Sequence, residues 1–504
     1  MEEIKVFYSD FGAKGDGVTN DFKAMKAAHD HANEIGVGAC VYATPKAKYY
    51  IGETGGETIT VKTNVNFQGA EIIIDDKAIS PTGPERRTPI FTVMREHEPI
   101  ILDAASDEVR ALNAACPITK ETKKLPLAFG YPAMIIPEND ERKVYIRVGA
   151  SPTSGDSQRE LIVIDAEGNI DEKTAVLIDY EKVTRLTVYR IDDAPISFEN
   201  VRITTIANEA PRAYPSYLRN IYIHRSNVTV RNLKHYVVGE GDDGAPYSGF
   251  INPRQMNNLF CEDCIFTAHK TYEMEGRHAY MGSYDIGGED ANELYYKNCN
   301  QSNFFEWGNW GIMGSNYCKN ITYDGCILSR FDAHAGVYNA TIIDSELDAI
   351  RLTGGGKFVL KNVKMHSDLL ISLREDFGCT WHGDIEIENV RFFNKRENVY
   401  LFGARHYPNH NFGYQAYFPE NVKIKNVSLR NPGTLHLFND VTPGEEYDLT
   451  ASSVTVGGEA IENVNKTMLP EEIEIENTVD GVQNFVISPD TTFASQIEKV
   501  IIRR

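Results

Sequence analysis

One pattern recurs along the chain from about residue 220 onward. A short β-branched strand is followed by an Asn-like residue (Asn, Asp, Gly or Ser) and then usually by an apolar or small residue, as in VTVRNL, ITYDGCIL, FVLKNVKM and VKIKNVSL. The copies recur at irregular steps of roughly 20 to 35 residues, a period typical of solenoids. Each strand is too short to bury a face alone, so neighbouring copies must stack. The residues after the Asn-like position are Leu233, Cys264, Cys299, Cys326, Glu346, Val363, Val390 and Val427.

The stacking of these copies predicts a fold in which inward side chains lie over their counterparts in the next coil. Cys264, Cys299 and Cys326 then form an internal stack of small apolar residues and not a set of disulfides. The Asn-like positions suit left-handed turns whose side chains bond the neighbouring backbone. A β-sandwich would also use short strands, but it does not explain the repeated corner. The expected fold class is all-β, a right-handed parallel β-helix, with the handedness set by the general preference of parallel crossovers.

The N-terminal segment fits the same fold. DFGAKGDGVTND is a cluster of turn residues, and Asn20 or Asp21 is a suitable N-cap for the amphipathic helix DFKAMKAAHDHANEIG, which Gly36 ends. A helix here would cover the open end of the solenoid, where unpaired strand edges otherwise invite association.

This opening, followed by VYATPKAKYYIG, resembles that of the pectate-lyase-like superfamily of right-handed parallel β-helix proteins. The superfamily includes polygalacturonases and other glycosidases, polysaccharide lyases and phage tailspike depolymerases, so the resemblance implies a carbohydrate substrate and often a trimer. The polygalacturonase motifs N-T-D, G-H-G and R-I-K are absent, and only GDDG (Asp242, Asp243) and Arg351 faintly match its D-D pair and its arginine. No catalytic residue is therefore transferred, and the subfamily is not identified.

Four regions are expected along the chain. Residues 1–93 hold the cap helix and first coils, and 213–440 hold the central β-helix with the site. Residues 94–212 are expected to be an inserted antiparallel β-rich region, because KVYIRVG, ELIVIDAEGNI, AVLIDYEKVTRLTVYRI and ISFENVRITTIAN alternate and are joined by Gly, Asp and Asn turns. Residues 441–504 are expected to form C-terminal β coils or a cap.

The net charge of the chain limits the classes of molecule that it is expected to bind. The 51 Lys and Arg against 72 Asp and Glu give a formal net charge of −21. This disfavours nucleic acid and anionic membranes, which need a basic footprint, and it fits a neutral oligosaccharide or polysaccharide more easily. An acidic glycan is repelled at long range, although a local arginine cluster or a bound cation can reverse this near a site.

The N-terminal residues bear on the cellular compartment, and the cysteine spacing bears on metal binding. The N-terminus carries no signal peptide, which predicts a cytoplasmic protein, or a secreted one if a signal has been removed. Cys261 and Cys264 form a lone C-x-x-C without a second pair, so no metal or cofactor is expected. Calcium is compatible with the loop GEGDDGAPYSGF but is indicated by no motif.

The segment LSRFDAHAGVYN places Arg330, Asp332 and His334 at alternating positions, so in a strand they share one face. Aligning neighbouring segments on the inward residues Ile312, Val337, Ile350 and Ile371 puts Met313, Tyr338, Arg351 and Ser372 on one outward ridge. Arg374 and Asp285 are expected on or beside it. A solvated ladder of charges would give the same pattern.

Aromatic and acidic residues gather in the same region. Exposed aromatics beside polar groups suit a sugar ring, which has an apolar face and a polar rim. The expected substrate-binding residues are Trp307, Trp310, Arg330, Tyr338, Arg351, Arg374, Trp381, His382, Tyr284 and Asp243. Neighbouring carboxylates shift each other's pKa values, giving the acid and the base or nucleophile of a glycosidase. The candidate catalytic residues are Asp332, His334, Asp285, Glu306, Glu375 and Asp376.

Three functions are consistent with these residues. The first is a glycoside hydrolase that uses two carboxylates, which we favour because acidic groups dominate the candidates. The second is a polysaccharide lyase, in which His334 or Tyr338 removes the proton α to a uronate carboxyl and an arginine neutralises the acid. The third is a non-catalytic glycan-binding or phage tail-type β-helix.

Two further expectations concern assembly and stability. Long solenoid flanks predict a homo-oligomer, possibly a trimer. Because Asp332 and His334 are placed on the outer face, replacing either is expected to leave the melting temperature nearly unchanged.

Overall fold

The computed structural model describes most of the chain and divides it into two compact units. Unit 1 comprises residues 1–99, 189–314 and 326–328, and unit 2 comprises residues 100–188, 315–325 and 329–504. Within the described residues no helix is long and apolar enough to cross a membrane. The described residues are 3–147, 152–211, 216–273, 280–282, 284–306, 309, 311, 313–378, 381–404, 419–439, 453–456, 459–462, 472–476, 482–486 and 499–503.

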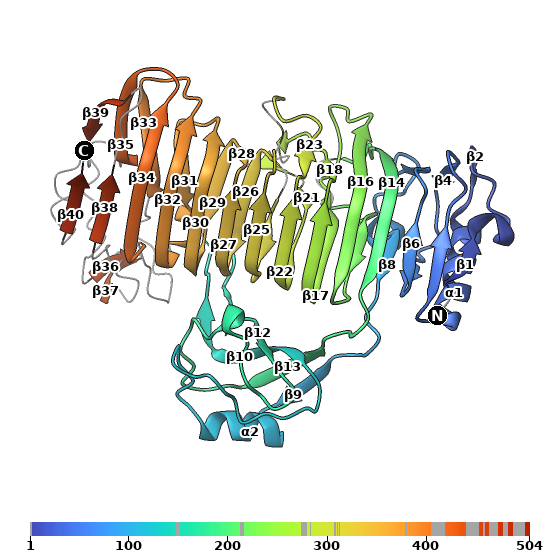
Figure 1. Ribbon diagram of the computed structural model, residues 1–504, viewed down its shortest axis with the longest axis horizontal. Coiled ribbons are helices and arrows are strands. Elements are labelled where there is room, and N and C mark those ends of the chain that lie inside the picture. The colour runs from blue at the N-terminus through green and yellow to red at the C-terminus, as the bar shows by residue number, and fades with distance from the viewer. Residues whose placement is uncertain are drawn as a thin grey trace. The chain divides into compact units, whose positions relative to one another are not determined.

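Unit 1 begins with the predicted helix, α1 (Phe22–Ile35), which lies beside β1 (Figure 1). Its buried face includes Phe22, Met25 and Ala28, which pack toward the first coils. Asn20 Oδ1 accepts the Phe22 amide at 3.2 Å, and Gly36 ends the helix at φ 80°. The predicted helix and both of its ends are confirmed.

The strands of unit 1 are short and follow one another at tight turns. They are β1 (Ile4–Phe7), β2 (Asp16–Asn20), β3 (Ala39–Tyr42), β4 (Lys48–Ile51), β5 (Ile59–Val61), β6 (Asn64–Asn66), β7 (Glu71–Asp75), β8 (Phe91–Val93), β14 (Ile196–Ile206), β15 (Ile221–Ile223), β16 (Val228–Val238), β17 (Ser248–Glu262), β18 (Ile265–Phe266), β19 (Tyr272–Glu273), β20 (Tyr280–Met281), β21 (Tyr284–Ile286), β22 (Glu289–Lys297) and β23 (Asn300–Gln301).

Strand β14 corrects one interpretation of the sequence. ISFENVRITTIAN was expected to be part of the antiparallel insertion, but β14 runs parallel to both β7 and β16, with Ile203 opposite Ile72 and His235. It is a rung of the coils. The Asn-Val pair at Asn200 and Val201 already matched the corner of the repeat in the sequence. In the structure Asn200 has φ 61° and Val201 is buried, as at the other corners.

The strands of unit 2 form coils and a separate small sheet. They are β9 (Ile100–Asp103), β10 (Ala133–Val144), β11 (Asp156–Arg159), β12 (Ile162–Ile164), β13 (Arg185–Arg190), β24 (Ser315–Asn316), β25 (Lys319–Asp324), β26 (Arg330–Ala335), β27 (Val337–Ile343), β28 (Glu346–Leu347), β29 (Ala349–Leu352), β30 (Gly354–Met365), β31 (Leu369–Leu373), β32 (Trp381–Phe392), β33 (Asn398–Ala404), β34 (Asn421–Leu429), β35 (Gly433–Asn439), β36 (Ser453–Val456), β37 (Glu459–Glu462), β38 (Glu472–Glu476), β39 (Val482–Val486) and β40 (Lys499–Arg503).

Two series of parallel strands build the coils of unit 2 (Figure 1). In the first, β26, β29, β31, β33 and β35 pair in order, and in the second β25, β27, β30, β32 and β34 do so. Inward residues stack in register, with Leu360 opposite Ile342 and Ile387. The predicted fold, a right-handed parallel β-helix, is confirmed.

The repeated corner is built as a ladder of asparagines. Asn362, Asn389 and Asn426 have φ between 55° and 56°, which confirms the predicted left-handed turn. Their side chains, however, bond one another and not the backbone: Asn389 Nδ2 donates to Asn362 Oδ1, and Asn426 Nδ2 to Asn389 Oδ1, each at 2.8 Å. One copy was misaligned, because Asp344 has φ 49° and Ser345, not Glu346, occupies the buried position after it.

The predicted cysteine stack is present in unit 1. Cys264, Cys299 and Cys326 are free thiols with at most 1% exposure.

The small sheet is antiparallel, as expected for the insertion. Strand β10 pairs with β11 and β12, and β13 pairs with β9. These strands and α2 (Asp107–Ala114) enclose their own core, which includes Leu112, Ile135 and Leu186. A buried ion pair joins this sheet to the coils of unit 2: Lys319 Nζ on β25 donates to Glu160 Oε2 at 2.9 Å, and neither side chain is exposed.

Candidate functional site

Strand β26 carries the alternating polar residues singled out in the sequence. Phe331 packs inside the coil against Tyr323 and Phe358, so Arg330, Asp332 and His334 share the opposite face, as predicted. Their expected exposure was wrong, because Asp332 is 0% exposed and Arg330 is 6% exposed. The guanidinium groups of Arg330 and Arg374 close over the Asp332 carboxylate.

Four arginines and two carboxylates form this site, which we call the arginine cluster (Arg147, Arg330, Arg351 and Arg374, with Asp332 and Asp376). Asp332 is 3.1 Å from Arg330 Nη2 and 2.9 Å from Arg374 Nη1. Asp376 accepts from Arg374 Nη2 and from Arg147 Nε, both at 2.7 Å. Arg351 is exposed on β29, opposite Asp332. The formal charge is 4 − 2 = +2, a local reversal in a chain of net charge −21.

The arginines keep both carboxylates ionised. Burial raises the pKa of Asp332, but the charges of Arg374 and Arg330 outweigh it and hold that pKa well below the usual range. Burial likewise raises the pKa of Asp376, and the hydrogen bonds and charges of Arg374 and Arg147 lower it overall. Neither group is suited to act as a protonated acid at neutral pH.

His334 lies at the edge of the arginine cluster in a defined orientation. Its Nδ1 is 2.7 Å from Asn316 Oδ1, and because that oxygen can only accept, Nδ1 carries the hydrogen. Among the described residues, no hydrogen-bond partner reaches Nε2, which therefore presents a lone pair. Burial and then the charge of Arg374 lower the pKa of His334 to about 4. The ring is neutral at neutral pH and can accept a proton at Nε2.

The predicted outward ridge is wrong in its register. Strand pairing places Asp332 beside Arg351 and Arg351 beside Ser372, whereas Tyr338 lies on β27 opposite Gly355. The chain turns from β26 to β27 at Gly336, which has φ 60°. The alternation of side chains runs through this turn without a break, and Gly336 is the one residue that marks the turn in the segment AHAGVYN.

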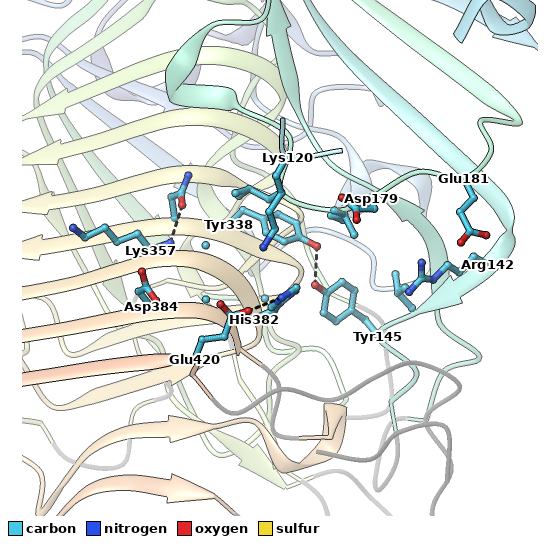
Figure 2. Close-up of a pocket in the computed structure, with 17 residues that line it drawn as sticks. Lys120, Arg142, Tyr145, Asp179, Glu181, Tyr338, Lys357, His382, Asp384 and Glu420 are labelled. Carbon is cyan, nitrogen blue, oxygen red and sulfur yellow. Dashed lines mark hydrogen bonds and ion pairs between the residues drawn. The ribbon is translucent and has the colours of Figure 1, made fainter. Parts of the chain in front are cut away.

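Tyr338 belongs instead to a cavity of about 780 Å³ between the insertion and the coils of unit 2 (Figure 2). Its hydroxyl is 2.8 Å from that of Tyr145, and His382 Nε2 is 2.7 Å from Glu420 Oε1. Burial and then the charge of Lys120 lower the pKa of His382. The acidic and basic residues that line the cavity are Lys120, Arg142, Asp179, Glu181, Lys357, His382, Asp384 and Glu420.

The cavity and the arginine cluster lie on two sides of one apolar group. Tyr145 and Val144 line the cavity and pack with Phe377, whose ring contacts His334 at 5.5 Å. The residues that the insertion contributes, including Tyr145, Arg147 and Lys120, were not predicted from the sequence. Tyr145 and Tyr338 are 193 residues apart, and no local pattern marks such a contact.

The remaining predicted residues are distributed elsewhere. Trp381 is fully buried against Phe358, because it begins β32 on the inward side, so its ring cannot stack on a sugar. Trp307, Trp310 and the side chain of Glu375 lie outside the described residues.

Four predicted residues belong to unit 1. Glu306 and Asp243 are exposed and Tyr284 is half-buried, whereas Asp285 is fully buried between His235 and His269.

Comparison with known proteins gave structural matches only. No family model and no curated protein matches the sequence. The tailspike protein gp49 from Pseudomonas phage LKA1 is 14% identical with a TM-score of 0.47, over 94% of this chain and 81% of that one. The gp54 tailspike of Acinetobacter baumannii bacteriophage AP22, in complex with capsular saccharide, is 10% identical with a TM-score of 0.45, over 98% and 79%. The mannuronan C-5 epimerase AlgE6 A-module of Azotobacter vinelandii is 13% identical with a TM-score of 0.31, over 92% and 99%. At these identities the likeness concerns the right-handed parallel β-helix fold alone.

Proposed function

We propose that the protein is a carbohydrate-active enzyme that cleaves a uronate-containing glycan by β-elimination at the arginine cluster. The observation that carries this proposal is the neutral His334, with its Nε2 lone pair presented, beside a site of formal charge +2. Arginine forks match the geometry of a carboxylate, and Arg351 is exposed for this contact.

The chemistry assigns a role to each group. The uronate carboxylate binds Arg351 and the edge of Arg374, which stabilise the negative charge that develops on it when the α carbon loses its proton. Nε2 of His334 takes that proton, the electron pair forms the C4–C5 double bond, and the C4–O glycosidic bond breaks. Water protonates the departing oxygen. The bound carboxylate also offsets the charge of Arg374 and so makes His334 a stronger base.

Glycoside hydrolysis is the second candidate, and the cavity favours it. A hydrolase needs one protonated and one ionised carboxyl group. Asp332 and Asp376 are both held ionised by arginines. Asp384 and Glu420 form a second pair of carboxyl groups, and both line the cavity. Hydrolysis would therefore take place in the cavity and not at β26.

A product assay separates these functions. The protein is incubated with a panel of uronic acid polymers and neutral polysaccharides, and ultraviolet absorbance and new reducing ends are measured together. Elimination raises both, because it creates an unsaturated uronate, whereas hydrolysis raises reducing ends alone. No change on any glycan would favour a binding protein and contradict the proposal.

A matched pair of variants tests the location. Arg351→Ala removes an exposed arginine of the cluster and should raise KM for a uronate polymer with little change in melting temperature. Lys361→Ala removes an exposed cation on β30, outside the cluster, and should change neither. An equal KM for both variants would place the reaction elsewhere.

A further inference from the structure

Three donor groups converge inside unit 1. His235 lies on β16, Asp285 on β21, and His269 in the segment after β18. Each is at most 1% exposed. His235 Nδ1 is 2.8 and 2.9 Å from the two oxygens of Asp285, and His269 Nε2 is 3.3 Å from Oδ1. All three donor atoms lie within 4.8 Å of one another.

The outer atoms of these side chains are held by a second layer of residues. His269 Nδ1 is 3.2 Å from Glu240 Oε1, and His235 Nε2 is 2.9 Å from Thr205 Oγ1. The Thr267 amide donates to Asp285 Oδ2 at 2.8 Å. Histidine ligands of metals characteristically donate their other N–H to a carboxylate or another oxygen, which fixes the tautomer.

This arrangement places a positive charge between the inner atoms. Glu240 accepts the hydrogen of His269 Nδ1, so Nε2 faces an oxygen of Asp285 either as the second N–H of an imidazolium or with its lone pair on a bound cation. Donor atoms bound to one zinc ion by bonds of about 2.0–2.2 Å stand roughly 3 Å apart, and each histidine nitrogen lies 2.8 to 3.3 Å from an oxygen of Asp285.

The surroundings favour a divalent charge. Within the described part of the chain, the ion pairs of Asp285 are with histidine alone. Asp285 and Glu240 together carry −2, which one divalent cation balances, and an uncompensated buried charge is costly. Phe250 stacks on His235 at 3.5 Å and 5°, and Tyr247 lies on His269 at 5.0 Å, so water is kept from the group.

We propose that His235 Nδ1, His269 Nε2 and the Asp285 carboxylate bind one divalent transition metal ion of the zinc class. Imidazole nitrogen with a single carboxylate selects such ions over calcium and magnesium, which take oxygen ligands. The ion would tie β16, β21 and the segment after β18 together across neighbouring coils. All three ligand side chains are buried, so we assign the ion a structural role, independent of the elimination proposed for unit 2.

Metal content tests the proposal directly. The full chain is refolded from guanidinium in chelator, dialysed, and refolded again with ZnCl₂ alone, and bound zinc is measured by mass spectrometry. One ion per chain and a higher melting temperature are expected. Asp285→Asn and His269→Gln should each retain less than a tenth of the ion, and Glu240→Gln should weaken binding roughly 10–100-fold.

Controls address folding and specificity. His224→Gln replaces another histidine of unit 1, which contacts Arg95 and the Arg254 carbonyl, and it should keep one ion per chain. If the ligand variants fail to fold, the wild-type chain refolded with CoCl₂ alone should show visible d–d bands that zinc abolishes. Wild-type protein that takes up no ion on refolding, shows no cobalt bands, or keeps its ion in Asp285→Asn would overturn the proposal.

Discussion

The carboxylate of Asp332 compensates two nearly buried guanidinium groups, those of Arg330 and Arg374. The sequence pattern placed this residue on an outer face, and the face is correct. Its burial depends on Arg374, which comes 42 residues later in the chain. Alternation along a strand reveals which residues share a face, but not what covers that face.

The sequence predicted that replacing Asp332 would leave the melting temperature nearly unchanged, and its burial reverses that prediction for Asp332→Asn. Breaking a buried ion pair leaves the partner charges uncompensated, so we expect the free energy of unfolding to fall by about 3–5 kcal/mol. Urea denaturation measures the change. Glu388→Gln breaks an exposed pair with Lys361 and should cost at most about 1 kcal/mol. Equal stability of wild type and Asp332→Asn would mean that the arginine cluster does not form in solution.

His334 gives a pH-dependent prediction. Its folded pKa of about 4 lies below the ordinary 6.5, so between these values the unfolded chain binds more protons than the folded one. Stability is therefore lost as the pH falls from about 6.5 to 4. His334→Gln should flatten this slope in melting temperatures recorded across pH, whereas His31→Gln, in an exposed position on α1, should keep it.

The same residue gives a kinetic prediction. Loss of the base should slow elimination by roughly 10²–10⁴-fold in His334→Gln. In the wild type, kcat/KM should remain high down to about pH 4, because it reports the pKa of the base in the free enzyme. An acidic limb near pH 6.5, or full activity in His334→Gln, would contradict the assignment of His334 as the base.

At the scale of the element, the corner of each coil depends on asparagine for two reasons. Asn389 adopts φ 56°, which costs other side chains more, and it both donates to and accepts from its ladder neighbours. The repeated Asn position made the turn predictable from sequence. The hydrogen-bond partner of each asparagine was not predictable, because side chains one coil apart, 27 or 37 residues along the chain, give no local signal of contact.

Two substitutions at Asn389 separate these contributions. Asn389→Gly keeps the backbone freedom and loses the ladder bonds, whereas Asn389→Ala loses both. We expect Asn389→Ala to be the less stable of the two by about 1 kcal/mol, as measured by urea denaturation. Equal stabilities would show that the left-handed conformation carries no cost at this corner.

At the scale of the whole molecule, the repeat and the opening residues were enough to predict the fold class. Each of the features that predicted it can be recognised within a short stretch of sequence: the β-branched strands, the Asn-like corners and the N-terminal helix. The candidate site was predicted only in part: Asp332, His334 and Arg374 come together, but Arg147 and Tyr145 arrive from the insertion. Two segments that are remote in sequence build this site, so it can be predicted in full only when the contact between the insertion and the coils is known.

The interior of the coils gives a chemical prediction. Cys40, Cys261, Cys264, Cys299, Cys318 and Cys326 are buried free thiols, so a thiol reagent should leave all six unlabelled in the native protein. Peptide mapping by mass spectrometry identifies the labelled residues. Cys116 is half-buried and serves as the internal reference for slow labelling. Prompt labelling of Cys264 or Cys299 would contradict the packed interior.

The insertion leaves and returns at neighbouring positions, because Ile100 on β9 is the antiparallel partner of Val188 on β13. A tight turn could replace everything between them without moving the chain outside, so such a segment can be gained or lost in one evolutionary event. Lys319 couples the coils to this segment. Its ammonium group bonds to Glu160 and to the Leu161 and Ala175 carbonyls of the insertion, so the insertion both buries and neutralises it. Related chains that keep the segment and the lysine should therefore keep the glutamate with it, whereas in chains that lack the segment this position faces water and is free to vary.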